Sequence, residues 1–263
     1  SNKNQIIYNS KKTSNDSEVL NLIDNFLTEK NSFIFESVEK GKIKGRYTIF
    51  GKNPDKIWEF NNNNSFLIKN KKKIKLKQKP QILIENIIED FKFKIPSGLP
   101  SISSLISGYF SYDAIRYIEN IPNTCKDDLK VPDVRLLRPR TLVIHDNLKK
   151  KIFYIINVFK DEKILNYSKK YAEIKSELTN LYTQSLTVKV NEDIFKKLSK
   201  VNVKSNTSKN KFLSMVNKAK KYIKIGDIFQ VVLSQRFEMK LSKKPLEIYK
   251  KLRLTNPSPF MYF

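Results

Sequence analysis

Cysteine and histidine are almost absent from this chain of 263 residues, which contains one of each, Cys125 and His145. A single cysteine excludes an internal disulfide and fits a reducing compartment such as the cytoplasm. A lone histidine, with no second histidine or cysteine to share a metal ion, is more often a hydrogen-bonded structural residue than a ligand or a base. Glycine-rich phosphate loops and nucleophile motifs are also missing. We therefore expect no catalytic residue and no metal ligand in this chain.

Long apolar runs are missing as well. No stretch approaches the roughly 18 apolar residues that a membrane-spanning helix requires, and the first residues lack the apolar core of a signal peptide. Hydrophobic residues nevertheless make up 40% of the chain, which is enough to build a core. The sequence predicts a cytoplasmic globular protein, with one large domain or one domain and part of another, and no membrane partner.

Acidic residues are too few to balance the basic ones. Lys and Arg total 51 against 26 Asp and Glu, a formal net charge of +25, but only seven of the basic residues are arginine. Recognition of bases and phosphates relies strongly on the planar guanidinium group. The lysines are spread along every segment, so we interpret them as solvated side chains on outer faces and expect no nucleic-acid partner. A basic nucleic-acid-binding module stays open as an alternative.

The last part of the chain carries three successive patterns. Residues 229–241 alternate between apolar and polar side chains, which predicts a long half-buried strand. Pro245 then stands where the first turn of a helix tolerates a missing N–H, and apolar residues follow it at helical spacing. The two prolines of residues 256–259 predict an extended chain beyond the helix.

A two-residue period also begins at Phe33. It places Phe33 and Ser37 on one face of a strand and Glu36 on the other. A short charged tract bracketed by glycines follows, and strand character resumes at residues 46–50, which predicts a hairpin. By default, a serine on the apolar face of a strand is a small core residue whose hydroxyl bonds a nearby carbonyl.

The rest of the chain mixes the two periods. Amphipathic helices are predicted over residues 19–27, 83–91, 164–181 and 212–223, and strands over residues 56–60, 65–69, 73–77, 141–144 and 151–159. Runs of strands with helices between them, without regular βαβ alternation, predict the α+β class.

Four blocks resemble one family, and one of them, LISGYFSYDAIRYIENIP, spans residues 105–122. Near the C-terminal end the chain reads GDIFQVVLSQRF and then NPSPFMYF, and near the other end it reads FIFESVEKGKIKGRYTIFG. Together they resemble anthranilate synthase component I, among the chorismate-utilising enzymes. Glu36 and Ser37 match the Glu-Ser of that family's N-terminal Leu-Leu-Glu-Ser motif. The related aminodeoxychorismate synthases are the alternative, but they tend to have Tyr-Gln-Val-Asn and Asn-Pro-Ala-Pro in the C-terminal blocks.

The resemblance implies an architecture. The family has an antiparallel two-sheet sandwich with helices packed outside, which we expect to be incomplete at the C-terminus of this chain. Residues 1–182 would form the N-terminal tryptophan-regulatory domain and residues 183–209 a linker. Residues 210–263 would begin the chorismate-binding domain.

The resemblance also implies a reaction. Members convert chorismate and ammonia to anthranilate and pyruvate in the first step of tryptophan synthesis, with Mg²⁺ as cofactor. Glutamine usually supplies the ammonia through a glutamine amidotransferase subunit, component II, so a hetero-oligomer is expected. The family's metal-binding glutamates and catalytic histidine belong to motifs downstream of Phe263, so we expect this chain to be inactive alone.

The resemblance finally implies an inhibitor site for tryptophan. Its matching positions are Ser37, Pro259, Phe260 and Met261, with Glu36 as the candidate for the ligand's ammonium group. Pro259, Phe260 and Met261 would give an indole ring apolar walls, while the amino and carboxylate groups of the tryptophan need polar partners. Phe260 replaces the family's commoner tyrosine, which removes a hydroxyl and keeps the ring. The hypothesis requires two blocks from opposite ends of the chain to fold side by side.

Overall fold

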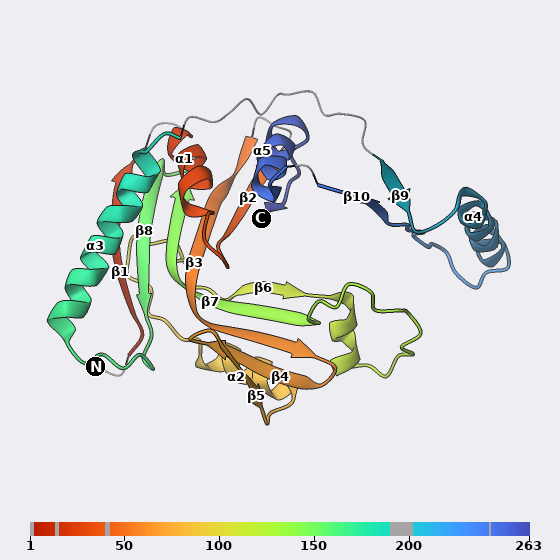
Figure 1. Ribbon diagram of the computed structural model, residues 1–263, viewed down its shortest axis with the longest axis horizontal. Helices are drawn as coiled ribbons and strands as arrows, with labels where there is room; N and C mark the ends of the chain where they lie inside the picture. Colours follow the sequence, from red (N-terminus) through yellow and green to blue (C-terminus); the bar gives the residue numbers. More distant parts are fainter. Residues whose placement is uncertain (1–2, 14–15, 40–42, 190–201, 242) are drawn as a thin grey trace. The chain divides into compact units, whose positions relative to one another are not determined.

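The computed structural model describes residues 3–13, 16–39, 43–189, 202–241 and 243–263. Contacts divide the chain into a first unit, residues 1–190 with 253–263, and a second unit, residues 191–252. Helices and strands occur in both units (Figure 1). The predicted α+β class is confirmed, because a large antiparallel sheet and a small second sheet are present together with helices.

The first unit is built on a nine-stranded antiparallel sheet. Its main path runs β1-β8-β7-β3-β2-β11, with β4 and β5 continuing from β3 and with β6 paired to β7. The strands are β1 (Gln5–Lys12), β2 (Phe33–Glu39), β3 (Ile43–Asn61), β4 (Asn64–Lys69), β5 (Lys72–Leu76), β6 (Ser107–Phe110), β7 (Val134–Asp146), β8 (Lys151–Val158) and β11 (Met261–Tyr262). The predicted strands of the β3-β4-β5 meander and of the β2-β3 and β7-β8 hairpins are confirmed.

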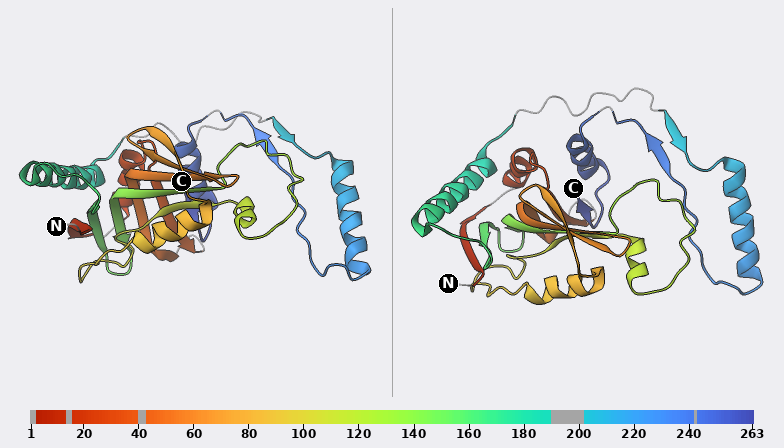
Figure 2. Two further views of the ribbon diagram at one scale, coloured as in Figure 1. Left: turned by 90° about the horizontal axis from the view of Figure 1, so that it is seen from below. Right: turned by 60° about the horizontal axis from the view of Figure 1, so that its bottom comes forward.

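Helices cover the sheet in two places. The first unit contains α1 (Ser17–Phe26), α2 (Pro80–Asp90), α3 (Tyr167–Leu186) and the 3₁₀ helix η1 (Tyr112–Tyr117). Helices α1 and α3 pack against each other and against strands β1, β3 and β8, whereas α2 packs on β4 (Figures 1 and 2). The predicted apolar face of α1 is confirmed, because its buried residues recur at helical spacing. Within the described ranges, no helix is long and apolar enough to cross a bilayer.

Strands β3 and β7 turn part-way along their length and so run through two parts of the sheet (Figure 1). The register of β3 against β7 shifts between Pro54 and Lys56, and Asn53 has a φ of 52°. A bulge of this kind bends a strand and increases its local twist. The turn therefore comes from a few residues around Pro54.

Two buried clusters lie along the sheet. One contains Phe33 and Phe153 and extends across the bend to Ile57, and the other lies beyond the bend and contains Phe60 and Trp58. Trp58, the only tryptophan in the chain, is 7% exposed. Its ring therefore lies in the core.

The second unit contains α4 (Lys209–Lys224) and a small sheet in which β9 (Val203–Ser205) pairs with β10 (Phe237–Met239). Helix α4 confirms the helix predicted over residues 212–223. It ends before Gly226, whose φ of 82° is the left-handed conformation that commonly follows a helix. Helix α5 (Pro245–Thr255) confirms the short helix predicted from Pro245, and the division between the units falls inside it.

The long strand predicted over residues 229–241 is wrong for most of its length. Only Phe237–Met239 forms a strand, and the side chains of Phe229 and Val232 are 93% and 81% exposed. An extended segment is stable when a neighbour satisfies its N–H and C=O groups. In the part of the chain that the structure describes, β9 alone pairs with this segment, through three residues. Residues 229–241 therefore have the alternating pattern of a strand, but among the described residues only three of them have a partner strand to pair with.

The predicted domain limits stay predictions. Contacts divide the chain after residue 190 and return residues 253–263 to the first unit, whereas the sequence suggested 1–182, 183–209 and 210–263. Helix α3 continues to Leu186, inside the predicted linker. Residues 190–201 of that linker lie outside the described residues.

Candidate ligand site at strands β2 and β11

The C-terminal strand β11 lies alongside β2, near the C-terminus marked in Figure 1. Met261 is the register partner of Glu36, and the backbones of Ile34 and Phe263 exchange two hydrogen bonds of 3.1 Å. The two prolines after α5 prevent the helix from continuing, and the chain passes through bends before it enters this ladder. The two sequence blocks that the inhibitor hypothesis required side by side are thus neighbours in one sheet.

Ser37 sits at an irregularity in β2. The register of β2 against β3 shifts between Glu36 and Val38, which makes Ser37 the residue outside the regular ladder. Its half-buried side chain lies against Gly45, where a methyl group would be 2.3 Å from the Ser37 Cβ and 2.5 Å from its Oγ. Bulges redirect side chains in this way. The glycine at position 45 is therefore needed for the position of Ser37.

Glu36 forms a buried ion pair with Arg253 of α5. The Arg253 Nε donates to both carboxylate oxygens of Glu36 at 2.9 Å, and the two side chains are 12% and 2% exposed, arginine first. A buried carboxylate needs such a partner, because desolvation of an unpaired charge is costly. The ion pair ties the last turn of α5 to β2 beside Met261. The contact of Glu36 with a ligand's ammonium group stays a prediction. Such a ligand would share the Glu36 carboxylate with Arg253.

The other predicted residues divide between two environments. Met261 is 5% exposed, whereas Phe260 is 82% exposed and Pro259 is also exposed. Strand β11 begins at Met261, and Pro259 and Phe260 precede it in a bend. The structure therefore buries Met261 beside Glu36 and leaves the two residues before it exposed. The predicted contacts of Ser37, Pro259, Phe260 and Met261 with tryptophan stay predictions.

Arg253 is the residue of this site that the sequence patterns did not reveal. It is an arginine in a helix whose other basic residues, Lys250 and Lys251, are lysines, and it lies just before the proline-containing block. Arginine is favoured over lysine where a planar guanidinium group pairs with a carboxylate. Its partner, more than half the chain away, could not be read from local periodicity.

Two buried tyrosines have strongly raised pKa values, and their contacts are those of core residues. Burial, together with the hydrogen bond to Asp133, raises the pKa of Tyr117, whose hydroxyl lies 2.8 Å from that carboxylate. Burial likewise raises the pKa of Tyr154, which lies 2.7 Å from the hydroxyl of Ser185. Both phenols therefore stay neutral near pH 7 and act as hydrogen-bonding core residues.

The described residues do not fit a site for Mg²⁺. Among them, no group of three or more His, Cys, Asp or Glu side chains is arranged to hold a metal ion. Magnesium prefers several oxygen ligands in octahedral geometry. We assign no reaction step through a metal ion to this part of the chain.

Comparison with known proteins identifies the family. The chorismate binding enzyme family matches residues 30–263, which include both strands of the candidate site. The chain belongs to the chorismate-binding enzymes. This member is 34% identical over 251 residues to anthranilate synthase component 1 of Acetivibrio thermocellus, a match that covers 93% of the chain and 50% of the relative. It is 30% identical over 267 residues to anthranilate synthase component 1 of Cereibacter sphaeroides, covering 99% of the chain and 53% of the relative.

A solved structure agrees with this assignment. The crystal structure of anthranilate synthase component I from Streptococcus pneumoniae TIGR4 matches with a TM-score of 0.65 and 26% sequence identity. The match covers 83% of the present chain and 47% of that chain. This chorismate-binding enzyme chain thus spans about half the length of the relatives that it matches.

Proposed function

We propose that this chain is the regulatory part of an anthranilate synthase component I and that it binds L-tryptophan between β2 and β11. The full enzyme would convert chorismate and ammonia to anthranilate and pyruvate. Glutamine would supply the ammonia through an amidotransferase partner, and Mg²⁺ would be bound by residues outside this chain. The observation that carries the proposal is the pairing of β11 with β2, because it joins the two blocks that resemble the family's tryptophan motif.

The accessible face of this pairing suits an aromatic amino acid. Phe260 and Pro259 are exposed and offer apolar surface to an indole ring. In our proposal the half-buried hydroxyl of Ser37 supplies a polar contact. Arg253 and Glu36 lie behind this face as a buried pair. In our proposal they hold α5 against β2 and so keep the two blocks at their spacing.

Calorimetry with L-tryptophan tests the proposed site. Phe260→Ala removes the exposed ring without opening the core, and we expect it to weaken binding at least tenfold. Ser37→Phe fills the space against Gly45 and should abolish binding. Ser176→Phe, the same change at an exposed position of α3, should leave the affinity unchanged. Unchanged affinity in Phe260→Ala would place the site elsewhere.

An assay with chorismate tests the enzymatic part of the proposal. With ammonium and Mg²⁺ present, we expect the chain to form no anthranilate, because the described residues contain no arrangement for a metal ion. The longer protein that contains this chain should form anthranilate under the same conditions. Aminodeoxychorismate as the product would favour the related synthase, and anthranilate from the chain alone would contradict the proposed division of roles.

The arginines weigh against a nucleic-acid-binding function. Each of the seven forms an ion pair with a carboxylate. The pairs are Arg46–Asp146, Arg116–Asp113, Arg135–Glu59, Arg138–Asp55, Arg140–Glu162, Arg236–Glu238 and Arg253–Glu36. Guanidinium groups engaged in this way are less available to phosphates and base edges. Titration of a labelled DNA duplex should show only weak binding that disappears as salt rises, and a sequence-specific complex at physiological salt would favour the alternative.

A further inference from the structure

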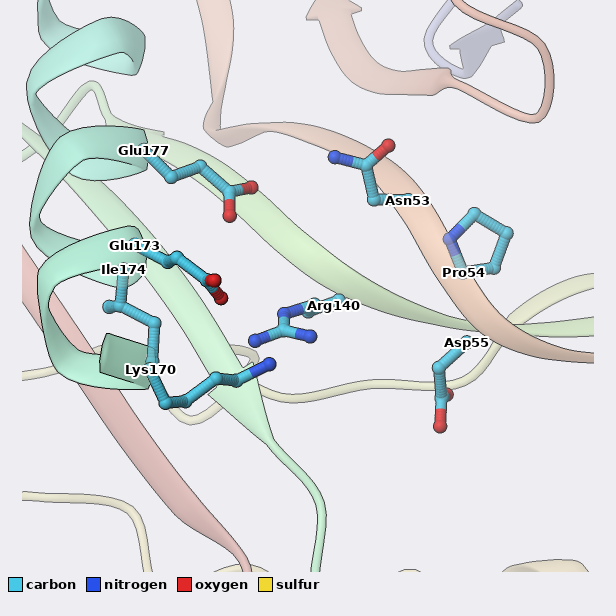
Figure 3. A pocket seen from close by; sticks show the side chains of 8 residues that line it. All are labelled: Asn53, Pro54, Asp55, Arg140, Lys170, Glu173, Ile174 and Glu177. Atoms are coloured by element: carbon cyan, nitrogen blue, oxygen red, sulfur yellow. The ribbon is translucent and has the colours of Figure 1, made fainter. Parts of the chain in front are cut away.

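A groove opens on the first unit between helix α3 and the bend in strands β3 and β7. Its volume is about 440 Å³, within the range of small-molecule sites, and the residues that line it come from all three elements (Figure 3). The groove is distinct from the β2-β11 pairing, because no residue of either of those strands lines it.

The bend explains why there is space at this point. Asn53 adopts a left-handed conformation, and the register shift after Pro54 turns β3 into the second part of the sheet. The half-buried ring of Pro54 provides apolar surface, whereas Ile174 lines the groove but is only 2% exposed. The groove can therefore accept a hydrocarbon portion of a ligand as well as polar groups.

One end of the groove is cationic and incompletely paired. Arg140 Nη1 and Lys170 Nζ share a single carboxylate oxygen of Glu162, at 3.3 and 3.0 Å. The Nε of Arg140 is buried and has no hydrogen-bond partner. Both cationic side chains point into the same space (Figure 3). The side chains of Arg140 and Lys170 are each 21% exposed, so a ligand's carboxylate in the groove can reach both cations without contacting the buried Nε.

The part of the α3 wall that follows Lys170 is anionic. Glu177 accepts a hydrogen bond of 2.6 Å from the Thr141 hydroxyl, and Glu173, one helical turn away, is exposed. Both carboxylates reach from α3 toward the space occupied by Arg140 and Lys170 (Figure 3). Two carboxylates repel a dianion such as phosphate but attract an ammonium group.

We propose that this groove binds a free α-amino acid as a zwitterion. The ligand's carboxylate accepts hydrogen bonds from Arg140 and Lys170, its ammonium group lies between Glu173 and Glu177, and its side chain packs on Pro54. The site is separate from the one proposed for tryptophan at β2 and β11, and the two can be tested independently.

Saturation-transfer NMR with the twenty common L-amino acids, followed by titration of those that bind, tests the proposal. Acetate and methylammonium, each carrying half of the zwitterion, should bind at least tenfold more weakly than the best amino acid. Lys170→Gln and Glu173→Gln lie at the groove's accessible rim, so both variants should fold, and each should weaken binding at least tenfold.

Matched controls separate this site from the other one. Lys169→Gln removes the same charge from the same helix at an exposed position outside the groove, and it should leave the affinity unchanged. Phe260→Ala should weaken tryptophan binding at β2 and β11 but not binding in the groove. The proposal is wrong if no amino acid binds, if inorganic phosphate binds more tightly than every amino acid, or if Lys170→Gln and Glu173→Gln have no effect.

Discussion

Gly45 and Ser37 touch so closely that the smallest added group changes their packing. A methyl group at position 45 would overlap the Ser37 Cβ at 2.3 Å. We expect Gly45→Ala to lower the free energy of unfolding by about 1–3 kcal/mol, the usual cost of overpacking. Urea unfolding followed by the fluorescence of Trp58, the only tryptophan and a core residue of the first unit, measures this.

A second substitution checks the cause. Ser37→Gly removes the Cβ and Oγ that the new methyl group would meet. In the Gly45→Ala background it should therefore restore part of the lost stability, even though glycine is unfavourable in a strand. If the single variant is as stable as the parent chain, the close contact does not constrain Ser37.

The Glu36–Arg253 pair should behave as a buried ion pair. Its side chains are 2% and 12% exposed. Removing one partner strands a charge, so Arg253→Met should cost about 3–5 kcal/mol in unfolding free energy. The double variant with Glu36→Met should be more stable than Arg253→Met alone, because neither charge is then buried.

An exposed ion pair in the same unit provides the control. Arg116 and Asp113 pair at 2.8 Å, with side chains 23% and 54% exposed. Asp113→Asn should cost less than about 1 kcal/mol, because solvent already screens that interaction. If Arg253→Met and Asp113→Asn lowered the unfolding free energy equally in urea, burial would not strengthen the Glu36–Arg253 ion pair.

Among the elements, β3 and β7 owe the shape of their bend to charged side chains as well as to the bulge. Arg138 of β7 pairs with Asp55 of β3 and with Asp161 beyond β8, and Lys56 of β3 also binds Asp161. Burial raises the pKa of Asp161, but the hydrogen bonds from Lys56 and Arg138 outweigh burial and lower it from 3.8 to about 2. The network is therefore favourable while Asp161 is ionised.

This network predicts a pH dependence. Because the folded state holds the pKa of Asp161 below its unfolded value, ionised Asp161 contributes stability above about pH 4. That contribution is lost as the pH falls through the folded pKa of about 2. Asp161→Asn should thus be less stable than the parent chain at about pH 6, and the gap should narrow in urea unfolding as the pH is lowered below about 4. A gap independent of pH would contradict the assignment.

Periodicity predicted most elements because each element's own residues carry its signal. Helix α1 buries one face at helical spacing, and β7 and β8 are rich in β-branched residues. Residues 229–241 carry an equally clear alternation, yet only Phe237–Met239 is a strand. Strand formation depends on a second segment, and neither its presence nor its position is encoded in the alternating residues.

Across the whole molecule, phenylalanines differ widely in how much of the residue is exposed to solvent. Phe229 is 93% exposed, and Phe50 is 0% exposed in the core of the first unit. Phe229→Ser should change the unfolding free energy by no more than about 0.5 kcal/mol, whereas Phe50→Ser should cost at least about 3–5 kcal/mol. Thermal unfolding followed by circular dichroism compares them, and a large loss in Phe229→Ser would mean that this ring is covered in solution.

Only part of the candidate site could be predicted from short sequence blocks. Resemblance in sequence blocks singled out Ser37, Pro259, Phe260, Met261 and Glu36. The folded chain then separated exposed Phe260 from buried Met261 and supplied Arg253 as the partner of Glu36. Neither the difference in exposure between these two neighbours nor a salt bridge between distant segments has a local signature, because both depend on contacts between segments far apart in the chain.

Local sequence was enough to predict the α+β class, most helices and strands, and the blocks that tie the chain to the chorismate-binding enzymes. Periodicity, proline and motif order are properties of neighbouring residues. Tertiary structure alone decided that β11 pairs with β2, that Glu36 binds Arg253, and that the bend at Pro54 opens a charged groove beside α3. Each of these depends on contacts between segments far apart along the chain, whose register and burial follow from packing of the whole sheet.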